Sequence, residues 1–158
     1  MSTRTIHSES SLYFITFTCF NWLHLFQLTN SYDTVYKWFS HLKEQKNIKT
    51  TTYAPKAFGV PNHVHCILFF PSPDFSLNKI ISNGKRFIAY EIINRLEATN
   101  QTETLNELES ALTAKEKTKG QKHKVFEESF DAKSIDNKKF FLKKLNYIHL
   151  NPFVVIGT

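Results

Sequence analysis

Glycine, cysteine and long apolar runs are all scarce in this chain of 158 residues, which has four glycines and two cysteines. The two thiols, Cys19 and Cys66, are too few for the disulfide framework of a small secreted domain. No stretch approaches the ~20 apolar residues of a membrane-spanning helix, and residues 1–11 lack the apolar core of a signal peptide. The sequence therefore argues against a disulfide scaffold and predicts a cytoplasmic protein that makes no contact with a membrane.

Phenylalanine and basic residues are abundant instead. The chain has fifteen phenylalanines, and 20 Lys+Arg against 14 Asp+Glu give a formal net charge of +6. Apolar residues make up 41% of the chain, enough for a folded core, and the length fits one domain over residues 1–158 with a disordered segment at 1–11. Cations neutralise phosphates and aromatic rings stack on unpaired bases, so nucleic acid is a candidate partner.

Hydrophobic periodicity predicts alternating strands and helices. Runs of β-branched and aromatic residues indicate strands at 12–21, 48–60 and 63–70, and a short edge strand at 125–130. Apolar residues at helical spacing indicate helices at 31–45, 77–96 and 137–150. This order predicts an α+β fold, a ferredoxin-like split βαβ sandwich with an antiparallel sheet and helices packed on one face of it.

Two regions after the second long helix are less regular. Residues 98–124 are polar, and we expect a short helix there, followed by a mobile basic loop, as an insertion in the domain. Pro152 is expected to end the last helix, because a proline disfavours helical geometry at the residue before it.

His63 and His65 form the sharpest local pattern. In a strand, residues two apart point to the same face, so the two imidazoles would project side by side. That arrangement suits two ligands of one divalent metal ion. A His-x-His pattern also arises by chance, as two partly exposed histidines on a strand, and the spacing alone leaves both interpretations open.

Tyr147 and Asn151 form a second pattern, on the last predicted helix. Residues four apart share a helix face, so a phenol and an amide would be presented together. The phenol could act as a covalent nucleophile and the amide oxygen as a metal ligand. The alternative is a buried tyrosine with Asn151 capping the helix end. Tyr90 is the rival nucleophile, on the second long helix, and His149 points to a different side of its helix from Tyr147.

Together these stretches resemble a known family. The run 58–68, FGVPNHVHCIL, is similar to the His-hydrophobic-His signature of single-tyrosine HUH transposases, and most of all to the IS200-like group and its REP-associated tyrosine transposase branch. The run 147–152, YIHLNP, resembles the tyrosine helix of that family. Residues 12–26 resemble its opening strand, and residues 122–130 resemble the segment between the motifs. The resemblance covers residues 12–153.

The resemblance implies a role for each motif residue. His63, His65 and Asn151 would be metal ligands for Mg²⁺ or Mn²⁺, which suit a set of nitrogen and oxygen ligands. Tyr147 would attack a DNA phosphodiester and leave a 5′-phosphotyrosine link with a free 3′-OH. The implied protein is a transposase-like endonuclease, a homodimer, that cleaves and rejoins single-stranded DNA and recognises DNA hairpins. No organic cofactor is expected.

Basic residues gain a role from this resemblance. Ten lysines lie between Lys115 and Lys144, against five acidic residues. They could line a path for single-stranded or hairpin DNA, and a solvated lysine face is the open alternative for each one. The candidate DNA-binding residues are Lys85, Arg86, Lys115, Lys117, Lys119, Lys122, Lys124, Lys143 and Lys144.

Two other functions are compatible with the sequence. A catalytically silent nucleic-acid-binding domain of the same fold would keep the basic residues and show no metal-dependent cleavage. A small metal-binding hydrolase unrelated to DNA would need a second cluster of His, Asp or Glu, which the sequence lacks outside these motifs. The intact pair His63 and His65, followed by Tyr147 and Asn151, favours the strand transferase.

Overall fold

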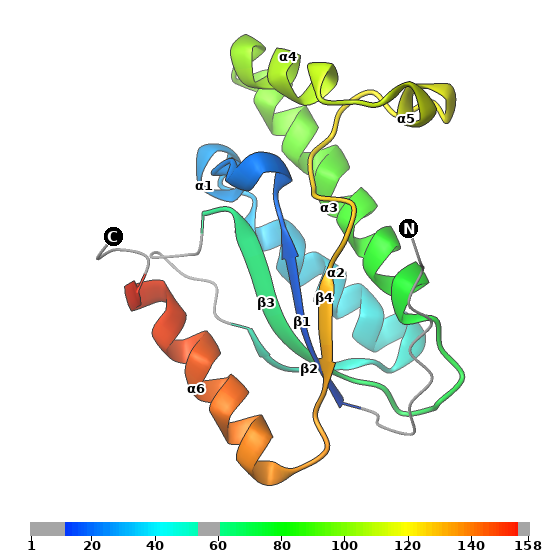
Figure 1. Cartoon of the computed structure of the whole chain (residues 1–158), viewed down its shortest axis with the longest axis vertical. Coiled ribbons are helices and arrows are strands. Elements are labelled where there is room, and N and C mark those ends of the chain that lie inside the picture. The colour runs from blue at the N-terminus through cyan, green and yellow to red at the C-terminus, as the bar shows by residue number, and fades with distance from the viewer. Residues whose placement is uncertain (1–11, 54–60, 155–158) are drawn as a thin grey trace.

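A computed structural model of the chain describes residues 12–53 and 61–154, and the side chains of these residues except at 51–53 and 150–154 (Figure 1). The expectation of disorder at 1–11 lies outside the described residues. So does the end of the strand expected at 48–60.

One antiparallel sheet lies at the centre of the fold, with its strands in the order β2-β3-β1-β4. Its members are β1 (Leu12–Thr18), β2 (Lys49–Tyr53), β3 (His63–Phe69) and β4 (Asp131–Ser134). The parallel strands β1 and β2 are separated by β3, which is the split βαβ arrangement. The predicted ferredoxin-like α+β fold class is therefore confirmed.

The helices follow the predicted order with several short additions. They are the 3₁₀ turn η1 (Phe20–Trp22), α1 (Leu25–Thr29), α2 (Tyr32–Lys46), α3 (Leu77–Ala98), α4 (Thr102–Ser110), α5 (Ala114–Thr118) and α6 (Lys138–Val154). Among the helices of the described residues, none is both long and apolar enough to cross a bilayer.

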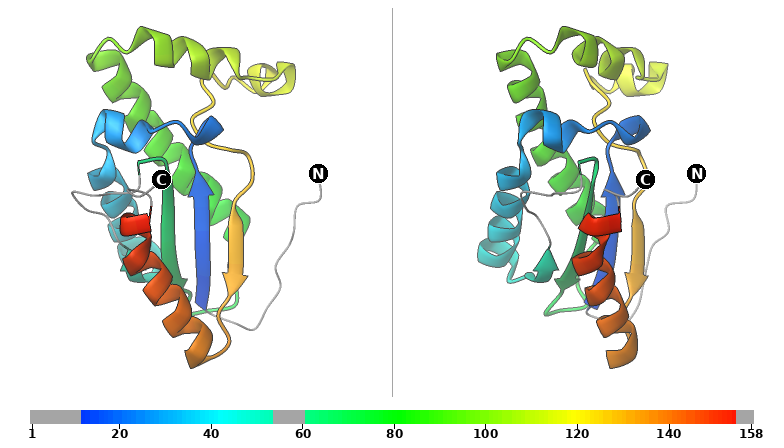
Figure 2. Two further views of the ribbon diagram at one scale, coloured as in Figure 1. Left: turned by 60° about the vertical axis from the view of Figure 1, so that its left-hand side comes forward. Right: turned by 90° about the vertical axis from the view of Figure 1, so that its left-hand side faces the viewer.

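The larger hydrophobic core lies between one face of the sheet and helices α2 and α3 (Figure 2). Alternate residues of β1, Tyr13, Ile15 and Phe17, are buried on this face, and Val64 and Cys66 of β3 join them. This alternation follows from the period of two along a strand. Many of the aromatic side chains of the protein pack in this core.

Helix α6 covers the opposite face of the sheet (Figure 2). A smaller core forms there from Phe14 of β1, Ile67 of β3, Ile135 after β4 and Ile148 of α6. The two helices of the split βαβ unit, α2 and α3, thus share one face as predicted, and the C-terminal helix that carries the tyrosine covers the other. The reason is that β1 and β3 carry apolar residues on both faces, so each face needs its own cover.

The last strand, β4, lies later in the chain than predicted. Residues 125–130 make only an isolated bridge, at Phe126. The Lys85 ammonium donates to the carbonyl oxygens of Glu127 and Glu128 at 2.6 and 3.1 Å. These carbonyls thus bind a side chain rather than a neighbouring strand, and the ladder with β1 begins only after them.

The polar region after α3 is helical over more of its length than predicted. The Thr113 hydroxyl accepts from the Glu116 N–H, and the Glu116 carboxylate accepts from the Thr113 N–H at 2.7 Å. This capping box stabilises the start of α5, and a 3.2 Å ion pair between Lys124 and Glu116 ties the following segment to it. The prediction of a basic loop is therefore wrong over Ala114–Thr118.

Helix α6 continues past its predicted end. It runs to Val154, although Pro152 lies in its last turn. A proline here removes the one backbone donor that would bond the Ile148 carbonyl in the preceding turn, and this loss does not end the helix. Asn151 therefore lies inside the helix rather than at its end.

Gly84 allows α3 to pack closely against α2. A Cβ at this position would overlap the indole ring of Trp38. Overpacking of this kind outweighs the better helix propensity of alanine, so Gly84→Ala should lower the free energy of unfolding by about 2 kcal/mol in urea denaturation. The control Asn83→Ala, at an exposed position of the same helix, should stay within about 0.5 kcal/mol of the original chain. Equal stability of the two variants would contradict the close packing.

Candidate functional site

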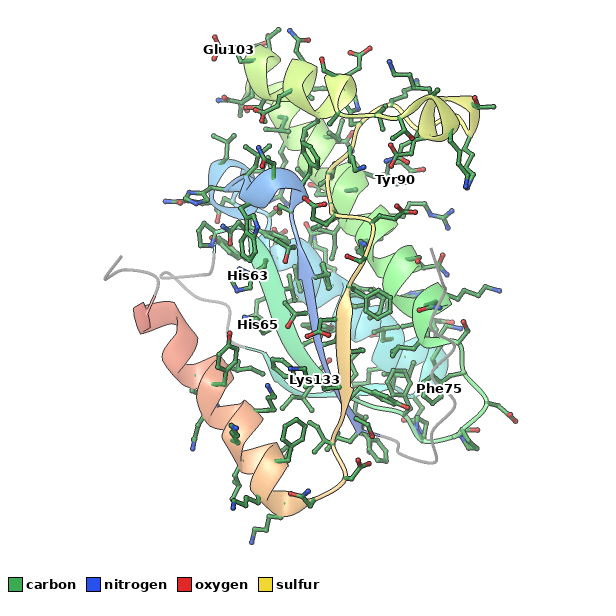
Figure 3. The ribbon with its side chains drawn as sticks, in the orientation of Figure 1. His63, His65, Phe75, Tyr90, Glu103 and Lys133 are labelled. Atoms are coloured by element: carbon green, nitrogen blue, oxygen red, sulfur yellow. The ribbon has the colours of Figure 1, made fainter. Side chains whose placement is uncertain are left out.

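The histidines of the His-x-His pattern lie side by side on β3, on the face of the sheet that α6 covers (Figure 3). His63 lies opposite Thr18 of β1, and His65 lies opposite Thr16. Val64, between them, is buried in the core on the other face. The period of two along the strand thus brings both imidazoles together, as the sequence predicts.

The two rings are fixed by hydrogen bonds at both of their nitrogens. His63 Nε2 and His65 Nε2 are 2.8 Å apart. His63 Nδ1 lies 2.7 Å from Asn62 Oδ1, and His65 Nδ1 lies 2.7 Å from Thr16 Oγ1. Because the Asn62 amide nitrogen donates to the Trp22 carbonyl at 3.2 Å, its oxygen faces His63 and accepts the Nδ1 proton. The Nε2 lone pair of His63 therefore points toward His65.

This donor set fits a divalent cation. Two nitrogens held about 2.1 Å from an octahedral ion are about 3.0 Å apart, close to the observed 2.8 Å. The hydrogen bond between the two Nε2 atoms places the proton of His65 on Nε2. In the other tautomer of His65 the Thr16 oxygen accepts from Nδ1, and both Nε2 lone pairs then face the same point. In the part of the chain that the structure describes, no third His, Cys, Asp or Glu completes a cluster. Asn151 lies one helical turn beyond Tyr147, with its side chain outside the described residues.

Burial lowers the pKa of both imidazoles. The pKa of His63 falls to about 4 because burial disfavours the charged ring. The pKa of His65 falls to about 3, through burial first and then through the charges of His63 and Lys144. Both rings are therefore neutral near pH 7, which is the protonation state that binds a metal ion.

Tyr147 lies beside this pair, on α6 of the same chain. Its ring centroid is 5.2 Å from that of His65 and 6.0 Å from that of Phe14, edge-on in both cases. The side chain is 47% exposed, so a polymer can reach it from solvent. The next residue, Ile148, is buried in the smaller core and holds the helix on the sheet. The structure thus brings His63, His65 and Tyr147 together.

Lys144 brings a positive charge to the same place. Its Nζ lies 4.5 Å from the ring centroid of Phe14 and 5.4 Å from that of Tyr147. Burial lowers the pKa of Lys144, and the nearby charges of Lys133 and Lys143 lower it further. This ammonium is thus placed one helical turn before Tyr147 and against its ring.

The rival nucleophile lies on the other side of the sheet. Tyr90 belongs to α3, away from His63 and His65, and points into solvent (Figure 3). His149 is exposed, in agreement with its expected place on a different side of α6 from Tyr147. Of the two candidate tyrosines, Tyr147 is therefore the one that the fold brings to the histidine pair.

The remaining predicted DNA-binding residues divide into two groups. Lys85 is held by the carbonyl oxygens of Glu127 and Glu128, and burial lowers its pKa to about 8. Lys124 is held by its ion pair with Glu116. The exposed members are Arg86, Lys115, Lys117, Lys119, Lys122 and Lys143. Two of these, Lys115 and Lys117, belong to α5, and Lys119 directly follows it. Helix α5 lies at the end of the molecule away from α6 (Figure 1), so the fold does not gather these cations around the histidine pair.

Sequence reasoning missed three residues that shape the site. Asn62 directly precedes the His-x-His pattern, and its short amide next to His63 could have indicated a hydrogen bond to that imidazole. Thr16 is 49 residues from His65, so only the pairing of β1 with β3 identifies it. Trp22 is exposed, and its ring centroid lies 5.9 Å from that of His63.

The lowered pKa values predict a pH effect on stability. The unfolded chain takes up protons at these histidines below about pH 6.5, whereas the folded chain does so only near pH 4 at His63 and pH 3 at His65. Stability is therefore lost as the pH falls through this window. The double variant His63→Asn/His65→Asn lacks this loss. Each histidine contributes about 2.5 kcal/mol to this loss between about pH 7 and pH 4.5. In metal-free buffer, the free energy of unfolding of the original chain should therefore fall by about 5 kcal/mol more than that of the double variant over this range. A constant difference in urea titrations would contradict the neutral pair.

Known proteins match this chain in structure rather than in sequence. No protein-family model and no curated protein matches the sequence. Among solved structures, a REP-associated tyrosine transposase bound to a REP hairpin matches with a TM-score of 0.61 and 19% identity, over 99% of this chain and 74% of that chain. A protein of Deinococcus radiodurans R1 assigned as a transposase matches with a TM-score of 0.48 and 11% identity, over 94% of this chain and 96% of that chain. The chain thus has the fold of the REP-associated tyrosine transposase, which confirms in its fold the resemblance that its motifs indicate.

Proposed function

We propose that the protein cleaves and rejoins single-stranded DNA through a covalent bond between Tyr147 and the 5′-phosphate of the cut strand. One observation carries this function. The centroid of the accessible Tyr147 ring lies 5.2 Å from that of His65, and the Nε2 atoms of His65 and His63 are 2.8 Å apart. Phosphoryl transfer needs a nucleophile and a charge-stabilising centre at the same phosphate, and this arrangement supports both. The transposase fold supports the same class of reaction.

The cation of this reaction would be Mg²⁺ or Mn²⁺. His63 and His65 would hold it through Nε2, and Asn151 would add an amide oxygen from α6. Nitrogen and oxygen donors suit these ions. Bound there, the cation would polarise the scissile phosphate and share its growing negative charge. Asn62 and Thr16 would keep the two rings in the required orientation, as residues behind metal ligands commonly do.

Tyr147 would carry the covalent step. Its phenol oxygen attacks the phosphorus, the bond to the 3′ oxygen breaks, and the proton lost by the phenol is balanced by one taken up at the released 3′ oxygen. The phosphotyrosine is itself a phosphodiester, so a 3′-OH can displace the tyrosine without an external energy source. Lys144 would stabilise the phenolate during attack and during release, since its ammonium lies 5.4 Å from the ring centroid.

DNA hairpins with single-stranded flanks are the proposed substrate. The structural neighbour is bound to a REP hairpin, and this chain carries a formal charge of +6 that favours a polyanion. Exposed lysines on α5 and α6 lie at separate ends of the molecule, which suits contacts with a folded DNA longer than the strand at the site (Figure 1). We further propose a homodimer that acts in the cytoplasm, as the family resemblance implies.

The nucleophile assignment predicts the loss of one covalent product. Labelled DNA hairpins with randomised single-stranded flanks, incubated with the protein and Mn²⁺, should give a protein–DNA adduct on a denaturing gel. Tyr147→Phe and His63→Ala should each reduce this adduct by at least about 100-fold, and EDTA should abolish it. Tyr90→Phe is the matched control and should leave the adduct unchanged.

Two outcomes of that experiment would count against the proposal. Adducts that persist in Tyr147→Phe would exclude this tyrosine as the nucleophile. Hairpin binding by the original chain without any metal-dependent adduct would instead favour the catalytically silent DNA-binding domain.

The orienting role of Thr16 predicts an effect on metal affinity. Thr16→Val removes the oxygen beside His65 Nδ1 and nearly keeps the shape of the side chain. It should weaken Mn²⁺ binding by about 10- to 100-fold, the usual range for loss of such a partner, in a titration followed by electron paramagnetic resonance. Thr18→Val, two residues along the same strand, should leave the affinity unchanged. Equal affinities of the two variants would show that Thr16 does not orient the ligand.

A further inference from the structure

Trp22 is an exposed tryptophan in the turn that follows β1, beside the histidine pair. Its side chain is 62% exposed, whereas Trp38, the other tryptophan of the chain, is 3% exposed. The indole lies edge-on to His63, with ring centroids 5.9 Å apart at an interplanar angle of 76°. An aromatic ring of this size left in water gives up a large gain from burial. Packing therefore does not explain why Trp22 lies next to the histidine pair.

The backbone of this turn adopts a conformation that side chains rarely allow. Asn21 and Trp22 both have positive φ angles, 50° and 56°. The left-handed region is unfavourable for residues with a Cβ, and more so for a bulky one than for asparagine. Such conformations persist only where the surrounding structure imposes them, and they gather at functional sites.

Hydrogen bonds from two distant segments impose this conformation. The Asn21 N–H donates to the Glu127 carboxylate at 2.8 Å. The Trp22 carbonyl accepts from the Asn62 amide nitrogen at 3.2 Å. The Asn62 amide oxygen accepts from His63 Nδ1. One amide side chain therefore fixes the turn that presents the indole and also the imidazole beside it.

We propose that Trp22 is a stacking platform for an unpaired base next to the phosphate bound at the histidine pair, an inference that rests on the proposed function. Stacking on a base needs an aromatic face that is exposed and fixed in place, and this turn supplies both. A base inside a duplex is already stacked on its neighbours and cannot offer its face. The platform thus selects a single strand beside the bond to be cut, and it tolerates any base because every base has such a face.

The tryptophan content of the chain makes this stacking measurable. In the variant Trp38→Phe, Trp22 is the only indole. A single-stranded oligothymidylate of about 12 nucleotides, within the usual site size for such binding, should quench its fluorescence as it binds. The quenching should follow the rise in anisotropy of the labelled oligonucleotide. A blunt duplex of the same length should leave the emission unchanged.

Affinity measurements give a second, independent readout. Trp22→Ala should raise the Kd for oligothymidylate about tenfold, in the range that loss of one base–aromatic stack produces, and Trp22→Phe should restore most of the affinity. Tyr90→Ala removes an aromatic ring that is 67% exposed on α3, and this matched control should leave the Kd unchanged.

The outcomes separate the platform from the proposed function. Binding of oligothymidylate with unchanged emission and an unchanged Kd in Trp22→Ala would overturn the platform, and the covalent adduct at Tyr147 would still test the chemistry. Failure of the original chain to bind any single-stranded DNA would overturn both.

Discussion

The register between β1 and β3 is the constraint on which the site depends. In this register His63 lies opposite Thr18 and His65 opposite Thr16. Because side chains alternate along a strand, a slip of β3 by one residue would turn both imidazoles into the main core and bring Val64 to the face under α6. The apolar residues of the main core make that slip costly. They therefore fix the convergence of the two Nε2 atoms at 2.8 Å, although they lie on the other face of the sheet.

The two faces of the sheet divide stability and chemistry between them. Beneath α2 and α3, β1 and β3 present an unbroken set of apolar residues. Beneath α6, the same strands carry Thr16, His63 and His65, and the buried cluster on that face is small. Polar residues at these positions add nothing to apolar burial, so most of the folding free energy must come from the other face. The buried rings of Phe17, Phe39 and Phe70 and the close approach of Trp38 to Gly84 belong to that face.

Local patterns predicted the parts of the site that are close in sequence. The period of two along a strand predicted that His63 and His65 lie side by side. The order of strands and helices predicted the sheet topology, because the rules for connections between elements allow only a few arrangements. The contact of Tyr147 with this pair could be expected only from the family resemblance, since it depends on α6 covering the second face of the sheet. Thr16 is fixed by long-range pairing, which no local pattern shows. Lys85 binds two carbonyl oxygens just before β4, in the stretch where the sequence predicts the strand, and a lysine on a helix gives no sign of that contact in sequence.

Asn62 couples the two halves of the site through the geometry of a single amide. Its oxygen accepts from His63 and its nitrogen donates to the Trp22 carbonyl, so the rotamer that satisfies one bond also directs the other. The side chain is nearly buried, and a buried amide that lost either partner would leave a polar atom unsatisfied. The orientation of the His63 imidazole and the position of the exposed Trp22 indole are therefore coupled. A site whose donors are fixed before the substrate arrives needs little reorganisation during the reaction. In this protein the Asn62 side chain holds both the proposed metal ligand, His63, and the turn that carries the proposed stacking residue, Trp22.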